Sequence, residues 1–264
     1  MQQSVPFFII QYMKKTFYCL FLCSFLGFYQ CTFSQVSPET TPLSHEIWNS
    51  LLQQHVSPDG HVNYKGFIKD SLQLNRYLAL LEKTNAQNTN WSESEKLAYW
   101  INAYNAFTVR LIIRHYPLES IKDITKINIP FINSPWDIKF IRIEEQTYDL
   151  NYIEHSVLRK KFEEPRIHFA INCASKSCPN LLNEAYLPET LEQQLQTAAI
   201  KFINNPQKNK LSGDEVALSE IFSWFKGDFT KKTSLIQFIH QYANTPLSEK
   251  AKINYLDYDW SLNE

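Results

Sequence analysis

Cys173 and Cys178 lie close together in the second half of the chain, and Glu154 and His155 come shortly before them. A thiol, an imidazole and a carboxylate this near in sequence predict one of three sites. Cys173 is a catalytic nucleophile, or the two cysteines form a disulfide, or the cysteines bind a metal ion with His155 and His168. The residues alone leave these alternatives open.

Nucleophilic catalysis requires that the thiol of Cys173 be activated. A free cysteine has a pKa of about 8.5, so little of it is thiolate at neutral pH. His155 is the candidate general base. The segment after Cys173 is rich in small residues, and we expect backbone N–H groups of Ala174 and Ser175 to stabilise an oxyanion. A predicted strand over residues 167–171 would aim the sulfur.

A third group should orient His155. Glu154 is a candidate catalytic residue, but neighbouring helical side chains point about 100° apart. Glu154 also fits the N3 position of a capping box that opens at Asn151. The orienting group is therefore expected elsewhere, among Asn102, Asn105, Asp137 and Asp149, and the two asparagines are preferred. They share one face of an apolar helix, where a buried amide equally suits the tethering of loops.

The other two alternatives involve the same cysteines. A Cys173–Cys178 disulfide fits an oxidising compartment and would add roughly 2 kcal/mol for so short a loop. A closed zinc site normally needs more than one pair of cysteines, and this spacing is looser than a zinc knuckle. We predict no metal and no other cofactor.

Four residues are candidate binding residues: Trp100, Tyr104, Ser175 and Ser177. The two aromatic residues fit a buried helix face equally well. Three further aromatic residues are expected in the core: Trp224, Phe225 and Trp260.

The elements that must position these residues follow from periodicity and caps. The longest predicted helix covers residues 93–115, with a Ser92–Glu95 capping box at its start and Pro117 after its end. Other helices are predicted over 43–55, 72–81, 151–162, 188–203 and 235–242. Strands are predicted over 62–64, 139–143, 146–150, 167–171, 216–218 and 252–256. This pattern predicts an α+β fold, with one domain (43–264) of mainly helices packed on a small, mostly antiparallel sheet.

The N-terminus predicts export. Residues 1–34 read as a signal peptide, with Met13 as a candidate true start and Lys14 and Lys15 before an apolar stretch. Residues 35–42 read as a linker. We expect a periplasmic or extracellular protein with no transmembrane span in the mature chain, and a lipoprotein anchored at Cys31 is less favoured.

Composition excludes some classes of function. The net charge is -1 with no basic block, which argues against nucleic-acid binding. The chain has 5 glycines and no glycine-rich phosphate loop. Oligomeric state is left open by the sequence.

Five segments together resemble the domain of unknown function 547 family: residues 100–106 (WINAYNA), 135–137 (PWD), 153–159 (IEHSVLR), 168–179 (HFAINCASKSCP) and 258–263 (YDWSLN). The resemblance covers most of residues 60–263 and implies a domain rather than a reaction. It implies an exported bacterial member and a thiol-peptidase-like fold, although His155 precedes Cys173, the reverse of the order in papain. Plant members commonly have serine at the position of Cys178, which implies a site role for Cys173 that needs no disulfide.

The predicted function is a thiol-dependent hydrolase or acyltransferase that uses Cys173 and His155 on an amide or ester. Its substrate would be a peptide or a small envelope-derived molecule. The alternative is a non-catalytic envelope module that binds a peptide or glycan and has a Cys173–Cys178 disulfide. A redox protein is a weaker third alternative because the spacing is not Cys-x-x-Cys.

Overall fold

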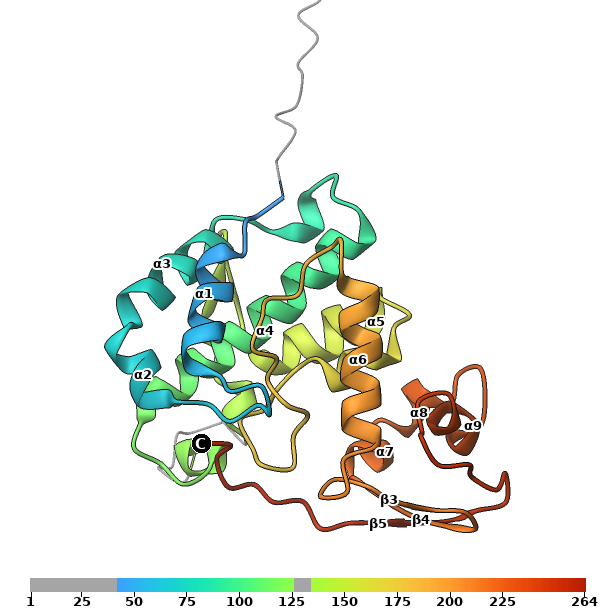
Figure 1. Cartoon of the computed structure of the whole chain (residues 1–264). Helices are drawn as coiled ribbons and strands as arrows, with labels where there is room; N and C mark the ends of the chain where they lie inside the picture. The colour runs from blue at the N-terminus through green and yellow to red at the C-terminus, as the bar shows by residue number, and fades with distance from the viewer. Residues whose placement is uncertain (1–41, 126–133) are drawn as a thin grey trace, which may run out of the picture. The chain divides into compact units, whose positions relative to one another are not determined.

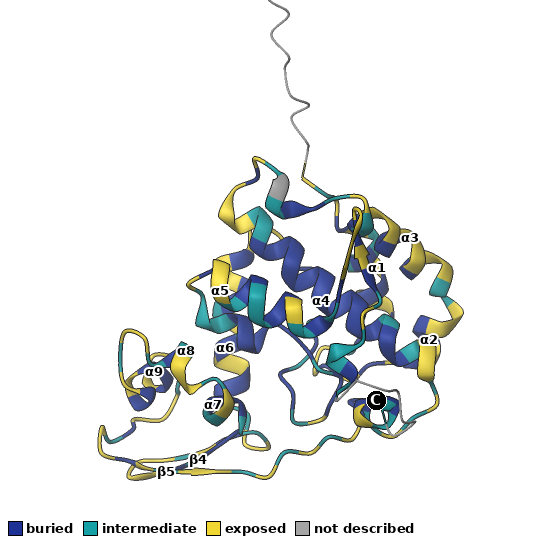
Figure 2. Cartoon of the chain, turned by 180° about the vertical axis from the view of Figure 1, so that it is seen from behind, coloured by how far each residue is buried: buried dark blue, intermediate teal, exposed yellow. Residues whose placement is uncertain are grey.

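Helix α4 (Glu93–His115) is the centre of the structure, a computed structural model that describes residues 42–125 and 134–264. The predicted signal peptide and residues 35–41 of the predicted linker lie outside the described residues. The capping box of α4 is confirmed, since the Ser92 hydroxyl accepts from Glu95 N–H and the Glu95 carboxylate accepts from Ser92 N–H. Most of α4 is buried (Figure 2) because it is apolar on nearly all sides.

Helices surround α4 on two sides (Figure 1). On one side lie α1 (Glu46–His55), α2 (Tyr64–Lys69) and α3 (Ser71–Glu82). On the other side lie α5 (Arg159–Lys161) and α6 (Leu191–Ile203). Three short helices follow near the C-terminus: α7 (Ile221–Trp224), α8 (Lys226–Phe229) and α9 (Leu235–His240). The 3-10 helices are η1 (Ala86–Asn88), η2 (Ile121–Thr125), η3 (Pro135–Asp137) and η5 (Pro165–Phe169), and η4 (Tyr152–Leu158) is a π-helix.

The described strands form two small sheets. β1 (Ile141–Ile143) and β2 (Gln146–Tyr148) make the predicted antiparallel hairpin. β3 (Lys210–Ser212) pairs antiparallel with β4 (Glu215–Leu218), and β4 pairs parallel with β5 (Lys252–Tyr255). The α+β class is therefore confirmed, with mainly helices and only small sheets.

Buried apolar side chains form two clusters. The larger surrounds α4 and includes Trp48, Tyr77 and Trp100. The smaller joins α6 to β4 and α7–α9, with Phe169, Phe222 and Phe229 in contact at its centre. None of the described helices is both long and apolar enough to cross a membrane.

Two of the predicted strands are wrong. Val62 makes only an isolated bridge with Val56, and Tyr64 already begins α2. Residues 167–171 do not form a strand, because η5 begins at Pro165 with the Glu164 carboxylate accepting from Arg166 N–H. Pro165 suits the first turn of a helix, where a missing N–H has no effect on the ladder.

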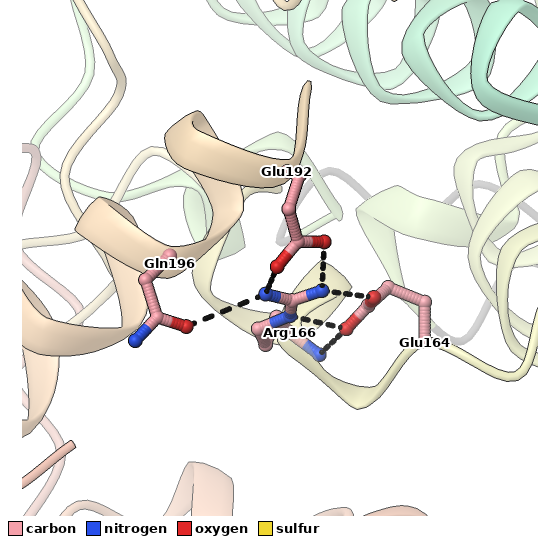
Figure 3. Close-up of polar contacts among 4 residues, drawn as sticks. All are labelled: Glu164, Arg166, Glu192 and Gln196. Carbon is pink, nitrogen blue, oxygen red and sulfur yellow. Dashed lines mark hydrogen bonds and ion pairs between the residues drawn. The ribbon is translucent and has the colours of Figure 1, made fainter. Parts of the chain in front are cut away.

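Arg166 fastens η5 to α6, as Figure 3 shows. Its guanidinium donates to Glu164 at 2.6 Å and to Glu192 of α6 at 2.7 Å. Planar guanidinium groups match two carboxylates in this way with good geometry. These two contacts fix η5 against α6. They therefore also fix the point from which the chain continues to Cys173.

The C-terminal segment is hydrogen-bonded to the cysteine loop. Lys176 N–H donates to Ser261 O at 2.8 Å, and Ser177 N–H donates to Asp259 O at 3.2 Å. Asn263 Oδ1 accepts from the Tyr64 hydroxyl at 2.7 Å. The segment thereby brings Tyr258 beside Cys173.

Candidate functional site

A cavity of about 180 Å³ brings together residues from α4, η3, η4, η5, α7 and the C-terminal segment. Its polar wall comprises Tyr104, Asn151, Glu154, His155, His168, Cys173 and Cys178. Its aromatic wall comprises Trp136, Trp224, Phe225, Tyr258 and Trp260. The thiol, imidazole and carboxylate singled out from the sequence therefore line one cavity.

The loop of Cys173 is held by amide side chains instead of a neighbouring strand. Asn105 donates to Ala170 O at 3.0 Å and accepts from Asn172 N–H at 2.9 Å. Asn172 Oδ1 accepts from Ala174 N–H at 2.8 Å. Ala174 has φ 62, a left-handed conformation that costs a non-glycine residue about 1–2 kcal/mol. The strain lies directly after Cys173, where the surrounding hydrogen bonds hold it.

Cys173 and Cys178 are both free thiols in the structure and are not joined by the disulfide of the alternative interpretation. Cys173 N–H donates to Cys178 Sγ at 2.8 Å. A hydrogen bond from Cys178 is the main cause that lowers the pKa of Cys173 to about 7, while burial acts in the opposite direction. Burial, and then the neighbouring sulfur, raise the pKa of Cys178 well above its usual value. Cys173 is therefore the more acidic thiol of the pair, and Cys178 keeps its proton.

Ser175 and Tyr258 also contact the sulfur of Cys173. Both hydroxyl groups lie 3.3 Å from Sγ, and they lie 3.1 Å from each other. With Ser175 N–H, they add to the lowering of the Cys173 pKa. Ala174 N–H, by contrast, is already bonded to Asn172, so only part of the predicted oxyanion site faces the sulfur.

Glu154 is buried in the polar wall, and its carboxylate accepts from the Tyr104 hydroxyl at 3.3 Å. Burial, and next the charge on Cys173, raise its pKa to about 7. The capping box predicted for Glu154 is wrong, because Asn151 makes no cap bond and donates to Asp137 instead. Asp149 caps this helix from two residues earlier by accepting from Tyr152 N–H.

A π-helix holds Glu154 and His155 on the same cavity. Such wide turns are rare and recur at functional sites. Nδ1 of His155 lies 3.0 Å from Arg159, an obligatory donor, so Nδ1 accepts and the proton of the neutral ring is on Nε2. Burial, and then Arg159, lower the pKa of His155. His155 therefore presents an N–H donor, and its role as general base stays a prediction.

The two asparagines of α4 tether loops. Asn102 donates to Tyr186 O at 2.8 Å and accepts from Tyr186 N–H at 3.0 Å. Asn105 makes the two bonds to the Cys173 loop given above. Their hydrogen bonds go to backbone groups, and their roles as orienting groups for His155 stay predictions.

Two of the four predicted binding residues lie at the site, and the other two have structural contacts. Tyr104 lines the cavity and Ser175 contacts Cys173. Trp100 is buried in the larger core cluster. Ser177 accepts from Asp259 N–H at 2.8 Å and so fixes the C-terminal segment.

Sequence reasoning missed three parts of the site. Tyr258 was quoted for the family resemblance alone, although its hydroxyl contacts Cys173. Trp224 and Trp260 were expected in the core but line the cavity, and the Trp224 side chain is 46% exposed. His168 forms a pair with Asp228, at 2.8 Å, which lies far from it in sequence.

Neither a metal site nor the largest neighbouring cavity competes with the cavity of Cys173 within the described residues. Within the described ranges, no three His, Cys, Asp or Glu residues are grouped so that they could hold a metal ion. A larger cavity of about 420 Å³ borders Arg159 and Arg166, but both guanidinium groups are already paired with carboxylates. The cavity of Cys173 is therefore the candidate functional site.

This fold and this cavity define a small α+β protein with a buried thiol site. Residues 88–203 match the family described as "Protein of unknown function, DUF547", which confirms over this range the resemblance predicted from the sequence. The matched range includes Glu154, His155, Cys173 and Cys178 but ends before Tyr258. Comparisons with curated proteins and with solved structures gave no match.

Proposed function

We propose that the protein is an exported thiol-dependent hydrolase or acyltransferase with Cys173 as its nucleophile. The observation that carries the proposal is the sulfur of Cys173 on the cavity wall, with three hydrogen-bonding neighbours and a pKa lowered to about 7. Cysteine thiolates are strong nucleophiles, and a pKa near the ambient pH balances the thiolate fraction against its intrinsic nucleophilicity.

Glu154 is a better candidate than His155 for the group that accepts the proton of Cys173. Its carboxyl group and the thiol both titrate near pH 7, and they share a cavity. Brønsted behaviour favours a base with a pKa near the working pH. His155 would first have to release Arg159 from Nδ1 before that nitrogen could take a proton.

The first half-reaction follows from these positions. The thiol proton passes to Glu154, and the sulfur forms a bond with the carbonyl carbon of an ester or amide. The bond to the leaving group then breaks, and Glu154 returns the proton to the leaving oxygen or nitrogen. The hydroxyl groups of Ser175 and Tyr258, which stabilise the thiolate, are the nearest donors for the oxyanion.

A chromogenic ester tests this proposal. With p-nitrophenyl acetate, we expect a burst of p-nitrophenolate that matches the protein concentration and an acetyl group on Cys173, read by peptide mass mapping. Cys173→Ala should lose the burst, and Cys178→Ala should keep it. A burst that survives in Cys173→Ala, or acetylation confined to Cys178, would contradict the proposal.

The aromatic wall favours one alternative, a non-catalytic module that binds a peptide or glycan. The rings of Trp224 and Trp260 stack with centroids 5.7 Å apart, and Tyr258 packs against both. In that alternative Cys173 and Cys178 form a disulfide. The intact mass of the native protein separates the two functions, because only the disulfide form gains two hydrogens on reduction.

Export rests on the N-terminal sequence. We expect the mature protein of an expressing bacterium to begin near residue 35 and to lie outside the cytoplasm. N-terminal sequencing that still finds residues 13–34 on the mature protein would contradict this part of the proposal.

A further inference from the structure

His168 is fixed in the wall of the same cavity by three neighbours. Nε2 lies 2.8 Å from Asp228 Oδ2. The ring stacks on Phe225 with centroids 4.0 Å apart and meets Phe229 nearly edge-on at 5.3 Å. The imidazole is therefore held in one orientation.

The pairing with Asp228 decides which nitrogen of His168 has the proton. Burial acts against the charge of Asp228, but hydrogen bonds from His168 and from Arg159 Nε, at 2.6 Å, hold the pKa of Asp228 below its usual range. Asp228 is thus a carboxylate that accepts from Nε2–H. Burial lowers the pKa of His168, so the ring is neutral and Nδ1 has a lone pair.

Nδ1 of His168 is buried and has no hydrogen-bond partner in the described parts of the chain. A buried acceptor without a partner is unfavourable and requires an explanation, such as a ligand or a water. His168 lines the cavity of Cys173, and its charged and titratable neighbours are Asp228, Arg159 and His155. His168 is thus a wall residue of the thiol site with a lone pair that no described group uses.

Two other acceptors that line this cavity have hydrogen-bond partners. Nδ1 of His155 accepts from Arg159, and the Glu154 carboxylate accepts from the Tyr104 hydroxyl. The cavity, at about 180 Å³, has room for an acyl group and water, because one water needs only about 10–15 Å³ of such space. A second reaction step with water requires a base, and Nδ1 of His168 is available for it.

We infer that His168, positioned by Asp228, is the base that activates water against the acyl group on Cys173. The inference rests on the proposed function and selects hydrolysis over acyl transfer. The water oxygen forms a bond with the thioester carbonyl carbon while one water proton passes to Nδ1. The carbon–sulfur bond then breaks, its electron pair returns to Cys173 as thiolate, and the acid leaves. The imidazolium releases its proton to solvent.

The test compares burst and turnover with p-nitrophenyl acetate in the full chain. His168→Gln should keep the burst but slow the steady rate by about 100-fold or more, and acetylated Cys173 should accumulate. Hydroxylamine, which attacks a thioester without a base, should restore turnover. His45→Gln is the matched control, because His45 is also buried and hydrogen-bonded, to Tyr77 at 2.7 Å. Asp228→Asn should likewise slow turnover while leaving the burst amplitude unchanged.

The outcomes separate the two claims. A burst followed by normal turnover in His168→Gln overturns the inference and leaves the proposed function intact. A wild-type protein with no burst and no acetylated Cys173 ends the proposed function, and the inference with it. If His168→Gln does not fold, ¹⁵N spectra of the wild-type histidines decide. An unprotonated Nδ1 in His168 supports the inference, and a protonated Nδ1 overturns it.

Discussion

The backbone N–H of Cys173 donates to the sulfur of Cys178 at 2.8 Å, and the thiol of Cys178 in turn donates to the sulfur of Cys173. Five positions apart in one loop, the two thiols thus have opposite properties. Cys178 keeps its proton because it is buried beside a negative sulfur, whereas Cys173 is stabilised as a thiolate. Cys178 is therefore the residue that sets the reactivity of Cys173.

Removal of the Cys178 thiol should make Cys173 less acidic. We expect Cys178→Ala to raise the pKa of Cys173 by about one unit, since its main stabilising donor is lost. Cys178→Ser should retain most of the effect because a hydroxyl group also donates. The pH dependence of iodoacetamide labelling at Cys173 measures the shift. An unchanged midpoint in Cys178→Ala would contradict the assigned role of Cys178.

The hydroxyl of Tyr258 should have a smaller effect of the same sign. Tyr258→Phe removes one of several donors to Cys173 but keeps the ring that packs on Trp224 and Trp260. We expect a slower alkylation of Cys173 at neutral pH with little change in thermal stability. Tyr255→Phe, an exposed tyrosine in β5, is the control. Equal rates in both variants would show that the contact does not act on the sulfur.

The contribution of Glu154 to the free energy of unfolding should decrease as the pH rises. Its folded pKa is raised from 4.5 to about 7, so its contribution to stability is complete below pH 4.5 and is lost as the pH rises to about 7. The loss amounts to about 3 kcal/mol for this group. Glu154→Gln cannot ionise and should unfold with less dependence on pH over this range.

Urea unfolding of Glu154→Gln at several pH values measures this difference. Glu163→Gln is the control, because the Glu163 side chain is 80% exposed and pairs only with the exposed Lys232. If Glu154→Gln and the wild type lose stability in parallel as the pH rises, Glu154 is ionised at acidic pH and is not the proton acceptor proposed here.

Asn105 and Asn102 form a matched pair of variants. Each buried amide makes two bonds to a backbone segment, so Asn105→Ala and Asn102→Ala should each destabilise the fold by about 2–4 kcal/mol. Only Asn105 holds the Cys173 loop, and only its variant should also slow the labelling of Cys173. Equal labelling rates of Cys173 in the two folded variants would show that the hydrogen bonds of Asn105 to the loop do not control the reactivity of Cys173.

Local signals in the sequence predicted most elements of the fold. Helix α4 has a capping box, an apolar surface and a proline after its end, and each signal depends on nearby residues only. The strand predicted over residues 167–171 failed because tertiary contacts decide this segment. Asn105 supplies the hydrogen bonds that a neighbouring strand would make, and an amide 65 to 67 positions away leaves no mark in the local pattern.

The site was predictable in its residue types but not in its pairings. Cys173, Glu154 and His155 stand out by chemistry and do line one cavity. Tyr258 as a partner of Cys173, and Asp228 as the partner of His168, could not be assigned, because hydrogen bonds between distant segments depend on the packing of the whole chain. The capping box at Asn151 shows the same limit, since a start two residues earlier at Asp149 frees Glu154 for the cavity.

The pH profile of alkylation at Cys173 tests the central claim most directly. The rate of iodoacetamide modification in the folded, reduced protein is followed by peptide mass mapping, with Cys173→Ala as the blank. We expect the rate at Cys173 to rise with a midpoint near pH 7 while Cys178 stays unlabelled. A midpoint at the ordinary thiol value of about 8.5, or labelling of Cys178 before Cys173, would contradict the account.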